Sequence, residues 1–221
     1  MCNENHEANR KFYDRISRVY DLLAEADEHK AREEGELLLK LGPGERVLEI
    51  GFGTGNSIIN IAESVGPAGL VCGIDVSGGM LDVAQAKITE KGLSDRVELM
   101  TGDARELPYE DDSFNAAFAS FTLELFPADD IPVVLAQVHR VLQDNGRIGI
   151  VSMAKVEEGE RASLIEKTYI WMHRHFPHIV DCRPIDPVKY LLDAGFIIRN
   201  EIDMEIWTMP VKCVVGTKAQ A

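Results

Sequence analysis

The chain has 221 residues, of which 45% are hydrophobic and 27% are charged, the composition of an ordinary globular protein of about one domain. It carries 23 Lys and Arg against 37 Asp and Glu, so its formal net charge is −14 at pH 7. A chain so acidic is repelled by phosphate backbones and anionic lipid surfaces, which argues against a nucleic acid or a membrane as partner. No charge-free apolar run approaches the roughly 18 residues that a membrane-spanning helix needs.

Two further features favour a cytoplasmic location. The N-terminus is polar and acidic, unlike a signal peptide. The four cysteines form no C-x-x-C pair, which indicates reduced thiols and no metal site. These cysteines are Cys2, Cys72, Cys182 and Cys213.

Short apolar runs and longer amphipathic runs alternate along the chain, which is typical of a parallel sheet with crossover helices. Helices are expected at residues 10–41, 56–65, 79–91, 131–142, 157–176 and 187–194. Strands are expected at residues 46–50, 70–75, 97–100, 114–123, 147–153, 196–206 and 211–217, with a tight turn at 144–146. The last two strands are joined by so short a link that they can only pair antiparallel. The pattern predicts an α/β fold with a seven-stranded, Rossmann-like sheet that ends in an antiparallel hairpin.

The strongest local signal is the run Glu49–Gly55, which leaves the first predicted strand and has glycines at positions 51, 53 and 55. Glycines there let the backbone turn sharply and let a ligand approach it, and the free N–H groups of the next helix face that ligand. A dinucleotide-binding turn has its third glycine where this chain has Asn56. Because Glu49 would repel a pyrophosphate and attract a cation, the turn favours a ligand with an ammonium group.

Carboxylates stand at the ends of three successive predicted strands. Glu49 ends the first, Asp75 ends the second, and Asp103 follows the third. A carboxylate at the position of Asp75 can accept hydrogen bonds from both ribose hydroxyls, and Asp103 can accept one from an adenine amino group. With Glu49 facing an ammonium group, the three describe a nucleoside that carries an amino-acid tail, which is S-adenosylmethionine (SAM).

These motifs resemble those of class I SAM-dependent methyltransferases over residues 46–153. The likeness rests on 47–56, 73–77 with 80–81, 102–104 with 107–108, 112–114, and 140–142 with 145–147. The run Phe12–Asp21 is similar to the opening of the ubiquinone/menaquinone-biosynthesis C-methyltransferases. Gln143-Asp144-Asn145 differs from the Lys-Pro-Gly-like turn usual in that family, and the segments after Met153 match it poorly.

The resemblance implies which residues bind SAM. The three glycines would hold the methionine moiety, Asp75 the ribose, and Val76 and Met80 the adenine. Tyr13 and Tyr20 would close the pocket, although packing of the N-terminal helix explains these two tyrosines equally well. The full implied set is Tyr20, Glu49, Gly51, Phe52, Gly53, Thr54, Gly55, Asp75, Val76, Met80, Asp103, Ala104, Ser120 and Phe121.

Methyl transfer from a sulfonium mainly requires alignment, and a general base is needed only where the acceptor is protonated. No Asn/Asp-Pro-Pro-Tyr/Phe run follows the strand at 114–123, so amino-methylation of nucleobases is disfavoured and a carbon or oxygen acceptor is favoured. The candidate bases are Tyr169, His173 and His175. Because the two histidines are two residues apart on a predicted helix, at most one of them faces the pocket, and each could instead be structural or exposed to solvent.

The sequence therefore predicts a SAM-dependent methyltransferase that acts on a small-molecule acceptor, with quinone-precursor-like or other aromatic compounds first. Two alternatives remain open, a non-catalytic SAM-binding partner subunit and an NAD-dependent oxidoreductase. We expect a single domain over residues 1–221. Its parts are an N-terminal helical cap at 1–41, a SAM-binding core at 42–153, a variable substrate segment at 154–194 and a C-terminal hairpin at 195–221.

Overall fold

The computed structural model describes residues 28–155, 183–206 and 209–220, and the first element is a helix at residues 28–39. The elements that follow are β1 (Arg46–Ile50), α2 (Asn56–Val65), β2 (Leu70–Asp75), α3 (Gly78–Glu90), β3 (Val97–Thr101), β4 (Phe114–Ser120), the 3₁₀ turn η1 (Leu123–Leu125), α4 (Ile131–Val141), β5 (Leu142–Met153), α6 (Pro187–Asp193), β6 (Phe196–Ile206) and β7 (Met209–Lys218).

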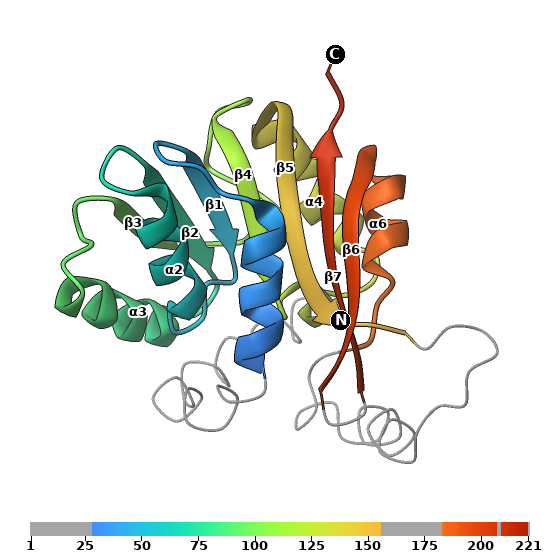
Figure 1. The fold of residues 1–221 in the computed structure, drawn as a ribbon, viewed down its shortest axis with the longest axis horizontal. Coiled ribbons are helices and arrows are strands. Elements are labelled where there is room, and N and C mark those ends of the chain that lie inside the picture. Colours follow the sequence, from blue (N-terminus) through green and yellow to red (C-terminus); the bar gives the residue numbers. More distant parts are fainter. Residues whose placement is uncertain (1–27, 156–182, 207–208, 221) are drawn as a thin grey trace.

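The strands form one seven-stranded sheet in the order β3-β2-β1-β4-β5-β7-β6 (Figure 1). The first five are parallel, and β7 runs antiparallel to both β5 and β6. The predicted seven-stranded α/β fold with an antiparallel hairpin is confirmed. The chain reverses its direction of winding between β1 and β4, which is where ligands bind in sheets of this kind.

Helices cover both faces of the sheet: the helix at residues 28–39, α2 and α3 lie on one face, and α4 and α6 on the other (Figure 1). Side chains of β1 alternate between the two resulting cores. Val47 packs in the first, whereas Leu48 and Ile50 pack in the second. By the same alternation, Glu49 points toward the face that carries α2 and the helix at residues 28–39.

Gly35 lets the helix at residues 28–39 lie close to the sheet. A Cβ atom on Gly35 would lie 2.3 Å from Cγ2 of Val151 on β5 and 3.3 Å from the ring of Phe118 on β4. Real Cβ atoms do not approach other atoms so closely, so a larger residue at this position would push the helix away from the strands.

Arg147 of β5 fastens the end of the same helix. Its Nε donates to the carbonyl oxygen of Leu39 at 2.6 Å, and its Nη2 donates to that of Lys40 at 2.9 Å. These are carbonyl groups that a helix cannot satisfy within itself at its C-terminal end. Glu45 holds the guanidinium in turn, with Oε2 at 2.7 Å from Nη2.

The predicted strand at 114–123 is too long. β4 ends at Ser120 because Phe121 has a left-handed φ of 49° and turns the chain toward η1. A bulky L-residue adopts this conformation only where its surroundings enforce it. Here the N–H of Phe121 donates to the carbonyl of Val151 at 2.7 Å, which fixes the turn against β5.

The predicted turn at 144–146 lies inside β5 and not before it. β5 begins at Leu142, and its pairing with β4 shifts register between Phe114 and Ala116. Asn145 in this irregularity has a φ of 60°. The turn residues therefore form a bulge within a longer strand, which periodicity alone does not distinguish from a turn that precedes a strand.

Some expectations concern residues outside the described ranges, namely the helix at 157–176, the part of the N-terminal helix at 10–27, and two of the cysteines. The cysteines within those ranges, Cys72 and Cys213, are free and buried. No helix in the described part of the chain is long and apolar enough to cross a membrane.

We expect Gly35→Ala to lower the free energy of unfolding by about 1–2 kcal/mol, because overpacking against Val151 outweighs the roughly 1 kcal/mol that Ala gains over Gly in a helix. Gly78→Ala is the matched control, since a Cβ at Gly78 meets no atom within 4 Å. That control should be unchanged or slightly more stable. Urea denaturation followed by circular dichroism measures both, and equal stabilities would contradict the close packing of the helix.

Candidate functional site

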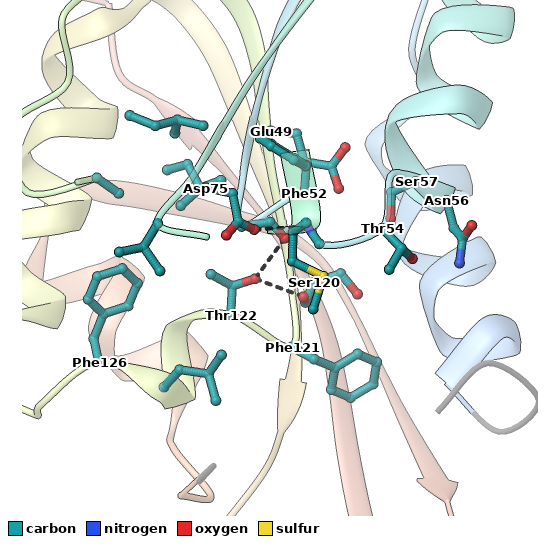
Figure 2. A pocket seen from close by; sticks show the side chains of 18 of the residues that line it. Glu49, Phe52, Thr54, Asn56, Ser57, Asp75, Ser120, Phe121, Thr122 and Phe126 are labelled. Atoms are coloured by element: carbon teal, nitrogen blue, oxygen red, sulfur yellow. Dashed lines mark hydrogen bonds between the residues drawn. The ribbon is translucent and has the colours of Figure 1, made fainter. Parts of the chain in front are cut away.

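A pocket lies at the carboxyl ends of β1, β2 and β4 (Figure 2). Most of the residues predicted to bind SAM line it: Glu49, Gly51, Phe52, Gly53, Thr54, Asp75, Val76, Met80, Asp103, Ala104, Ser120 and Phe121. Gly55 does not belong to the lining, and Tyr20 lies outside the described ranges. The lining also includes residues that the motifs did not indicate, among them Glu28, Arg32, Asn56, Ser57, Thr122, Leu125 and Phe126.

Gly51 and Gly53 shape the turn after β1. Both have a left-handed φ, of 69° and 52°, which L side chains rarely adopt. A Cβ atom on Gly51 would lie 2.3 Å from Cγ2 of Thr122, so glycine lets the segment after β4 approach the turn. A Cβ atom on Gly53 would meet nothing within 4 Å, so the space beside it is open to a ligand.

The carboxylate of Asp75 is oriented by two backbone N–H groups. Oδ2 accepts from the N–H of Gly53 at 2.9 Å, and Oδ1 accepts from that of Ser77 at 2.9 Å. A carboxylate oxygen can accept more than one hydrogen bond, so these contacts hold the group in place for ligand hydroxyls without exhausting it. Asp75 thereby also fixes the glycine turn relative to the end of β2.

Gly55 serves helix packing. A Cβ atom on it would lie 2.9 Å from Cβ of Ala84, so the start of α2 can contact α3 only because position 55 has no side chain. The neighbouring Asn56 accepts a hydrogen bond from Nζ of Lys87 at 2.9 Å. The third glycine of this turn therefore acts on the pocket indirectly, by allowing α2 and α3 to pack closely.

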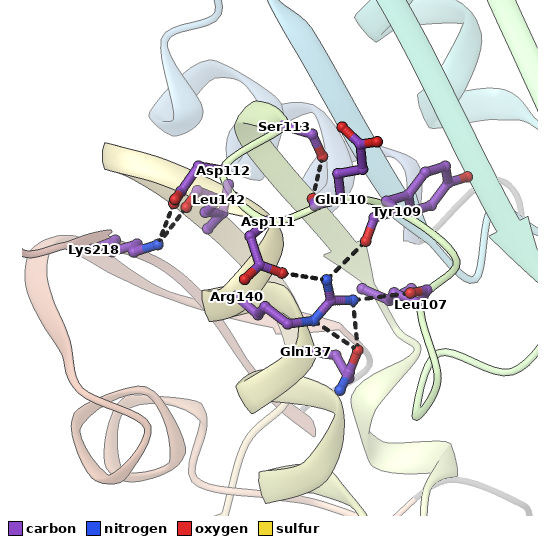
Figure 3. A network of polar contacts seen from close by, with 10 residues as sticks. All are labelled: Leu107, Tyr109, Glu110, Asp111, Asp112, Ser113, Gln137, Arg140, Leu142 and Lys218. Atoms are coloured by element: carbon purple, nitrogen blue, oxygen red, sulfur yellow. Dashed lines mark hydrogen bonds and ion pairs between the residues drawn. The ribbon is translucent and has the colours of Figure 1, made fainter.

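Arg140 of α4 holds the loop at residues 102–113 (Figure 3), and the first three residues of this loop line the pocket. Its Nη2 donates to the carbonyl of Leu107 at 2.9 Å, and its Nη1 donates to the carbonyl of Tyr109 and to Oδ1 of Asp111, both at 2.7 Å. A single guanidinium thus provides hydrogen bonds to two backbone carbonyls and one carboxylate of a loop whose backbone does not pair with a strand.

Asp103 in this loop is paired with Arg105, whose Nε lies 3.0 Å from each carboxylate oxygen. Nη1 of the same arginine lies 2.8 Å from Oδ2 of Asp130. The carboxylate of Asp103 therefore lies at the pocket in a defined orientation. Its contact with an adenine amino group stays a prediction.

Glu49 is buried at the end of β1 and only 2% exposed. Burial raises the pKa of its carboxyl well above the ordinary value, Glu36 adds to the rise, and Arg32 and Ser57 oppose it. Burial also raises the pKa of Glu36 to about 7. Of these two residues Glu49 lines the pocket, and a positively charged ligand group beside its carboxyl would lower its pKa, so this end of the pocket favours a cation.

Three buried polar atoms of residues that line the pocket have no hydrogen-bond partner within the described ranges: Oε2 of Glu49, Nη1 of Arg32 and Oγ of Ser120. Buried polar groups are nearly always satisfied, and each unsatisfied one costs about 1–3 kcal/mol. The three belong to β1, to the helix at residues 28–39 and to β4. A ligand that carries both hydrogen-bond donors and acceptors would satisfy them.

The wall of the pocket that follows β4 is apolar, and Phe121, Leu125 and Phe126 line it (Figure 2). Arg183 fastens this wall from outside. Its backbone N–H donates to the carbonyl of Glu124 at 3.3 Å, and its Nη2 donates to that of Phe126 at 2.7 Å. The wall therefore has a fixed shape suited to an apolar ligand.

Glu124 lies within η1 and is 1% exposed. Its Oε1 accepts from the N–H of Met153 at 3.0 Å, while Oε2 has no partner in the described part of the chain. Burial raises the pKa of this carboxyl to about 8. Because Glu124 does not line the pocket, its role in this structure is to join η1 to β5.

The predicted bases Tyr169, His173 and His175 lie outside the described ranges. The residues that the motifs missed lie mainly on helices. Glu28, Arg32 and Glu36 recur every four residues beside a buried stripe that includes Gly35 and Leu39. Charges spaced in this way along the edge of an apolar stripe are the one signal that could have indicated Arg32.

The comparisons with known proteins point to the same class. The methyltransferase domain family matches residues 47–146. A demethylmenaquinone methyltransferase of Lactobacillus johnsonii is 32% identical over 182 residues, which cover 81% of this chain and 73% of the relative. One of Listeria monocytogenes is 34% identical over 159 residues, which cover 70% of this chain and 66% of the relative, just under two thirds.

Solved structures share the fold at low sequence identity. The [4+2]-cyclase SpnF has a TM-score of 0.75 and 21% identity, with 96% of this chain and 95% of that chain covered. A SAM-dependent methyltransferase from Aquifex aeolicus has a TM-score of 0.65 and 20% identity, with 91% and 97% covered. Geranyl diphosphate methyltransferase in complex with SAM has a TM-score of 0.70 and 16% identity, with 85% of each chain covered. These likenesses concern the fold alone.

The fold and the glycine turn define a nucleoside-binding α/β enzyme. The chain belongs to the class I SAM-dependent methyltransferases. SAM is its cofactor, and neither the oxidoreductase nor the non-catalytic alternative is favoured. The pocket fits SAM, because it offers an open glycine turn, an oriented carboxylate and buried polar atoms that lack partners.

We expect the stability of the SAM-free protein to fall as the pH rises from about 5 to about 8. Glu124 loses its proton near its ordinary pKa of 4.5 in the unfolded chain but only near 8 in the folded one. The folded state therefore binds more protons across that interval, and stability decreases with pH. Glu124→Gln should make the fall smaller in urea denaturation at pH 5.5 and pH 8.5. Glu110→Gln, at an exposed position, is the control. If Glu124→Gln lost as much unfolding free energy between the two pH values as this control does, the expectation would be contradicted.

Proposed function

We propose that the methyl acceptor is an apolar small molecule, methylated at carbon or oxygen, with a quinone-precursor-like ring as the first candidate. The apolar wall after β4 carries this proposal, because Phe121, Leu125 and Phe126 line the pocket near Ser120. An aromatic acceptor would bury its ring against this wall and exclude water from the reacting atom. The name of the relatives, demethylmenaquinone methyltransferase, supports an acceptor of this chemistry.

In the proposed arrangement, Asp75 accepts hydrogen bonds from the ribose hydroxyls, and the methionine moiety lies along Gly51 and Gly53. Its ammonium group faces Glu49. The adenine lies beside Met80, which is 1% exposed. Val76, Asp103 and Ala104, which also line the pocket, are the other residues expected to contact the adenine. Ser120 and Phe121 then lie near the sulfonium.

When bound, SAM supplies a methyl group on a positively charged sulfur, which needs no further activation. The chain's own residues align the acceptor and exclude water, and alignment of this kind lowers a barrier by roughly 7–11 kcal/mol. A phenolic or carbon acceptor that is protonated also needs a base. Tyr169, His173 and His175 remain our candidates for that role.

We further propose that residues 1–221 form a single domain whose variable segment at 154–194 selects the acceptor, and that the protein acts in the cytoplasm. The free thiols of Cys72 and Cys213, both buried within the sheet strands, agree with a reducing compartment.

Asp75→Ala should weaken SAM binding about 100-fold, because the variant loses the ribose acceptor and the hydrogen bond that fixes Gly53. Isothermal titration calorimetry measures the affinity. Asp95→Ala, which removes an exposed carboxylate paired with Arg96, is the control and should bind SAM like the wild type. Unchanged affinity in the Asp75→Ala protein would refute the ribose assignment.

Phe126→Ala should lower kcat/KM for a reduced naphthoquinone acceptor about tenfold or more, since the ring's contact with the acceptor is lost, and should leave the affinity for SAM unchanged. Transfer of radioactive methyl from SAM measures the rate. Val133→Ala at an exposed position of α4 is the control. If the wild type binds SAM but methylates no apolar phenol or quinol, the proposed acceptor class is wrong.

A further inference from the structure

Strand β5 extends beyond the end of β4, and other segments complete the edge of β5 that β4 leaves open. Ser120, the last residue of β4, pairs with Val151, whereas β5 continues to Met153. The N–H of Met153 donates to Oε1 of Glu124 at 3.0 Å, and its carbonyl accepts from the N–H of Ile185 at 3.0 Å. A side chain of η1 therefore takes the place of a neighbouring strand at this edge.

We infer that Glu124 is a positioning residue for the methyl acceptor: by joining η1 to β5, its buried side chain fixes Leu125 and Phe126, the two residues of the apolar wall that directly follow it. The inference rests on the proposed function, because it requires the acceptor to lie against this wall. It adds a residue outside the pocket that determines how well the acceptor binds.

The turn η1 has few hydrogen bonds of its own. The N–H of Leu125 donates to the carbonyl of Thr122 at 3.1 Å, and the N–H of Phe126 donates to that of Leu123 at 3.2 Å. Hydrogen bonds of a short 3₁₀ turn have poor geometry and do not fix where the turn lies relative to a sheet. The position of the wall therefore depends on contacts outside the turn, among which the contact of Glu124 reaches the sheet directly.

The carboxyl of Glu124 is neutral when it holds the wall. Burial raises its pKa to about 8, Glu28 on the helix at residues 28–39 adds to the rise, and the N–H of Met153 opposes it. The other charged group that contacts this turn is Arg183, whose guanidinium is directed to the carbonyl of Phe126. Loss of the proton would leave a buried carboxylate with one unpaired oxygen behind the wall, which is costly and favours displacement of the turn.

The cofactor part of the pocket is held by different contacts. Asp75 orients the glycine turn through the N–H of Gly53, and it accepts from Ser77 at the start of α3. These hydrogen bonds do not involve Glu124. A change at position 124 should therefore alter use of the acceptor while binding of SAM stays the same, and misplacement of an acceptor by about 1 Å is enough to slow a reaction.

The test compares Glu124→Leu with Glu124→Gln. The amide oxygen of Gln can still accept from Met153, as the protonated carboxyl does, whereas Leu has a similar size and accepts nothing. In methyl transfer from SAM to a reduced naphthoquinone at pH 7, Glu124→Leu should raise the KM for the acceptor about tenfold, and Glu124→Gln should stay within about threefold of the wild type. Calorimetric titration should show SAM affinities within about threefold of the wild type for both.

A pH series provides a second readout that does not depend on folding of the Leu variant. Between pH 7 and pH 9, the acceptor KM of the wild type divided by that of Glu124→Gln should rise at least about threefold, because only the wild type has a group at position 124 that ionises near pH 8. The division cancels the ionisation of the acceptor, which is the same in both measurements.

Glu110→Leu is the matched control, since it makes the same replacement at an exposed position. It should keep the wild-type KM and the wild-type affinity for SAM. A wild-type acceptor KM in folded Glu124→Leu, a SAM affinity that falls as much as the KM rises, or a KM ratio that does not change with pH would overturn the inference and leave the proposed function standing. A wild type that binds SAM but methylates no apolar phenol or quinol would overturn both.

Discussion

The carboxylate of Asp75 joins the ends of two neighbouring strands. One oxygen accepts from the turn after β1 through Gly53, and the other accepts from the start of α3 through Ser77. The glycine turn can keep its left-handed residues in place because this acceptor holds it, and Thr122 closes on it from the other side. Two segments of chain thus meet at one carboxylate, a third packs against the turn that this carboxylate holds, and the pocket lies between them.

The fold was largely readable from the sequence because the first three parallel strands are short, mainly apolar runs that end at or just before a glycine or an acid. The misjudged places have local physical causes. Phe121 continues the apolar pattern of β4, yet its backbone turns left-handed where β5 accepts its N–H, and side-chain type does not reveal that turn. Asn145 has the residue type of a turn, but the strand resumes on both sides of it as a bulge.

The site was readable only where sequence-local motifs build it. Glycines and acids at strand ends are positioned by the strand itself, so the sequence could place Glu49 and Asp75 at the pocket, where the structure has them. Arg32 and Ser57 reach the pocket from helices, and which side of a helix faces a ligand depends on packing between distant segments. For Arg32 that packing is set by Gly35, which belongs to no recognisable motif, and by Arg147, whose motif does not indicate that its side chain holds a helix about 110 residues earlier in the chain.

The antiparallel strand β7 lies between β5 and β6, although it follows both in the chain. During synthesis β6 therefore has no neighbour in the sheet until residues 209–218 leave the ribosome, and β5 keeps an open edge for the same time. Open strand edges attract other chains. Strand β7 thus pairs with the open edge of β5 and with the open edge of β6 at the same time. A chain that ends before β7 is expected to need a chaperone even after its cofactor-binding half has folded.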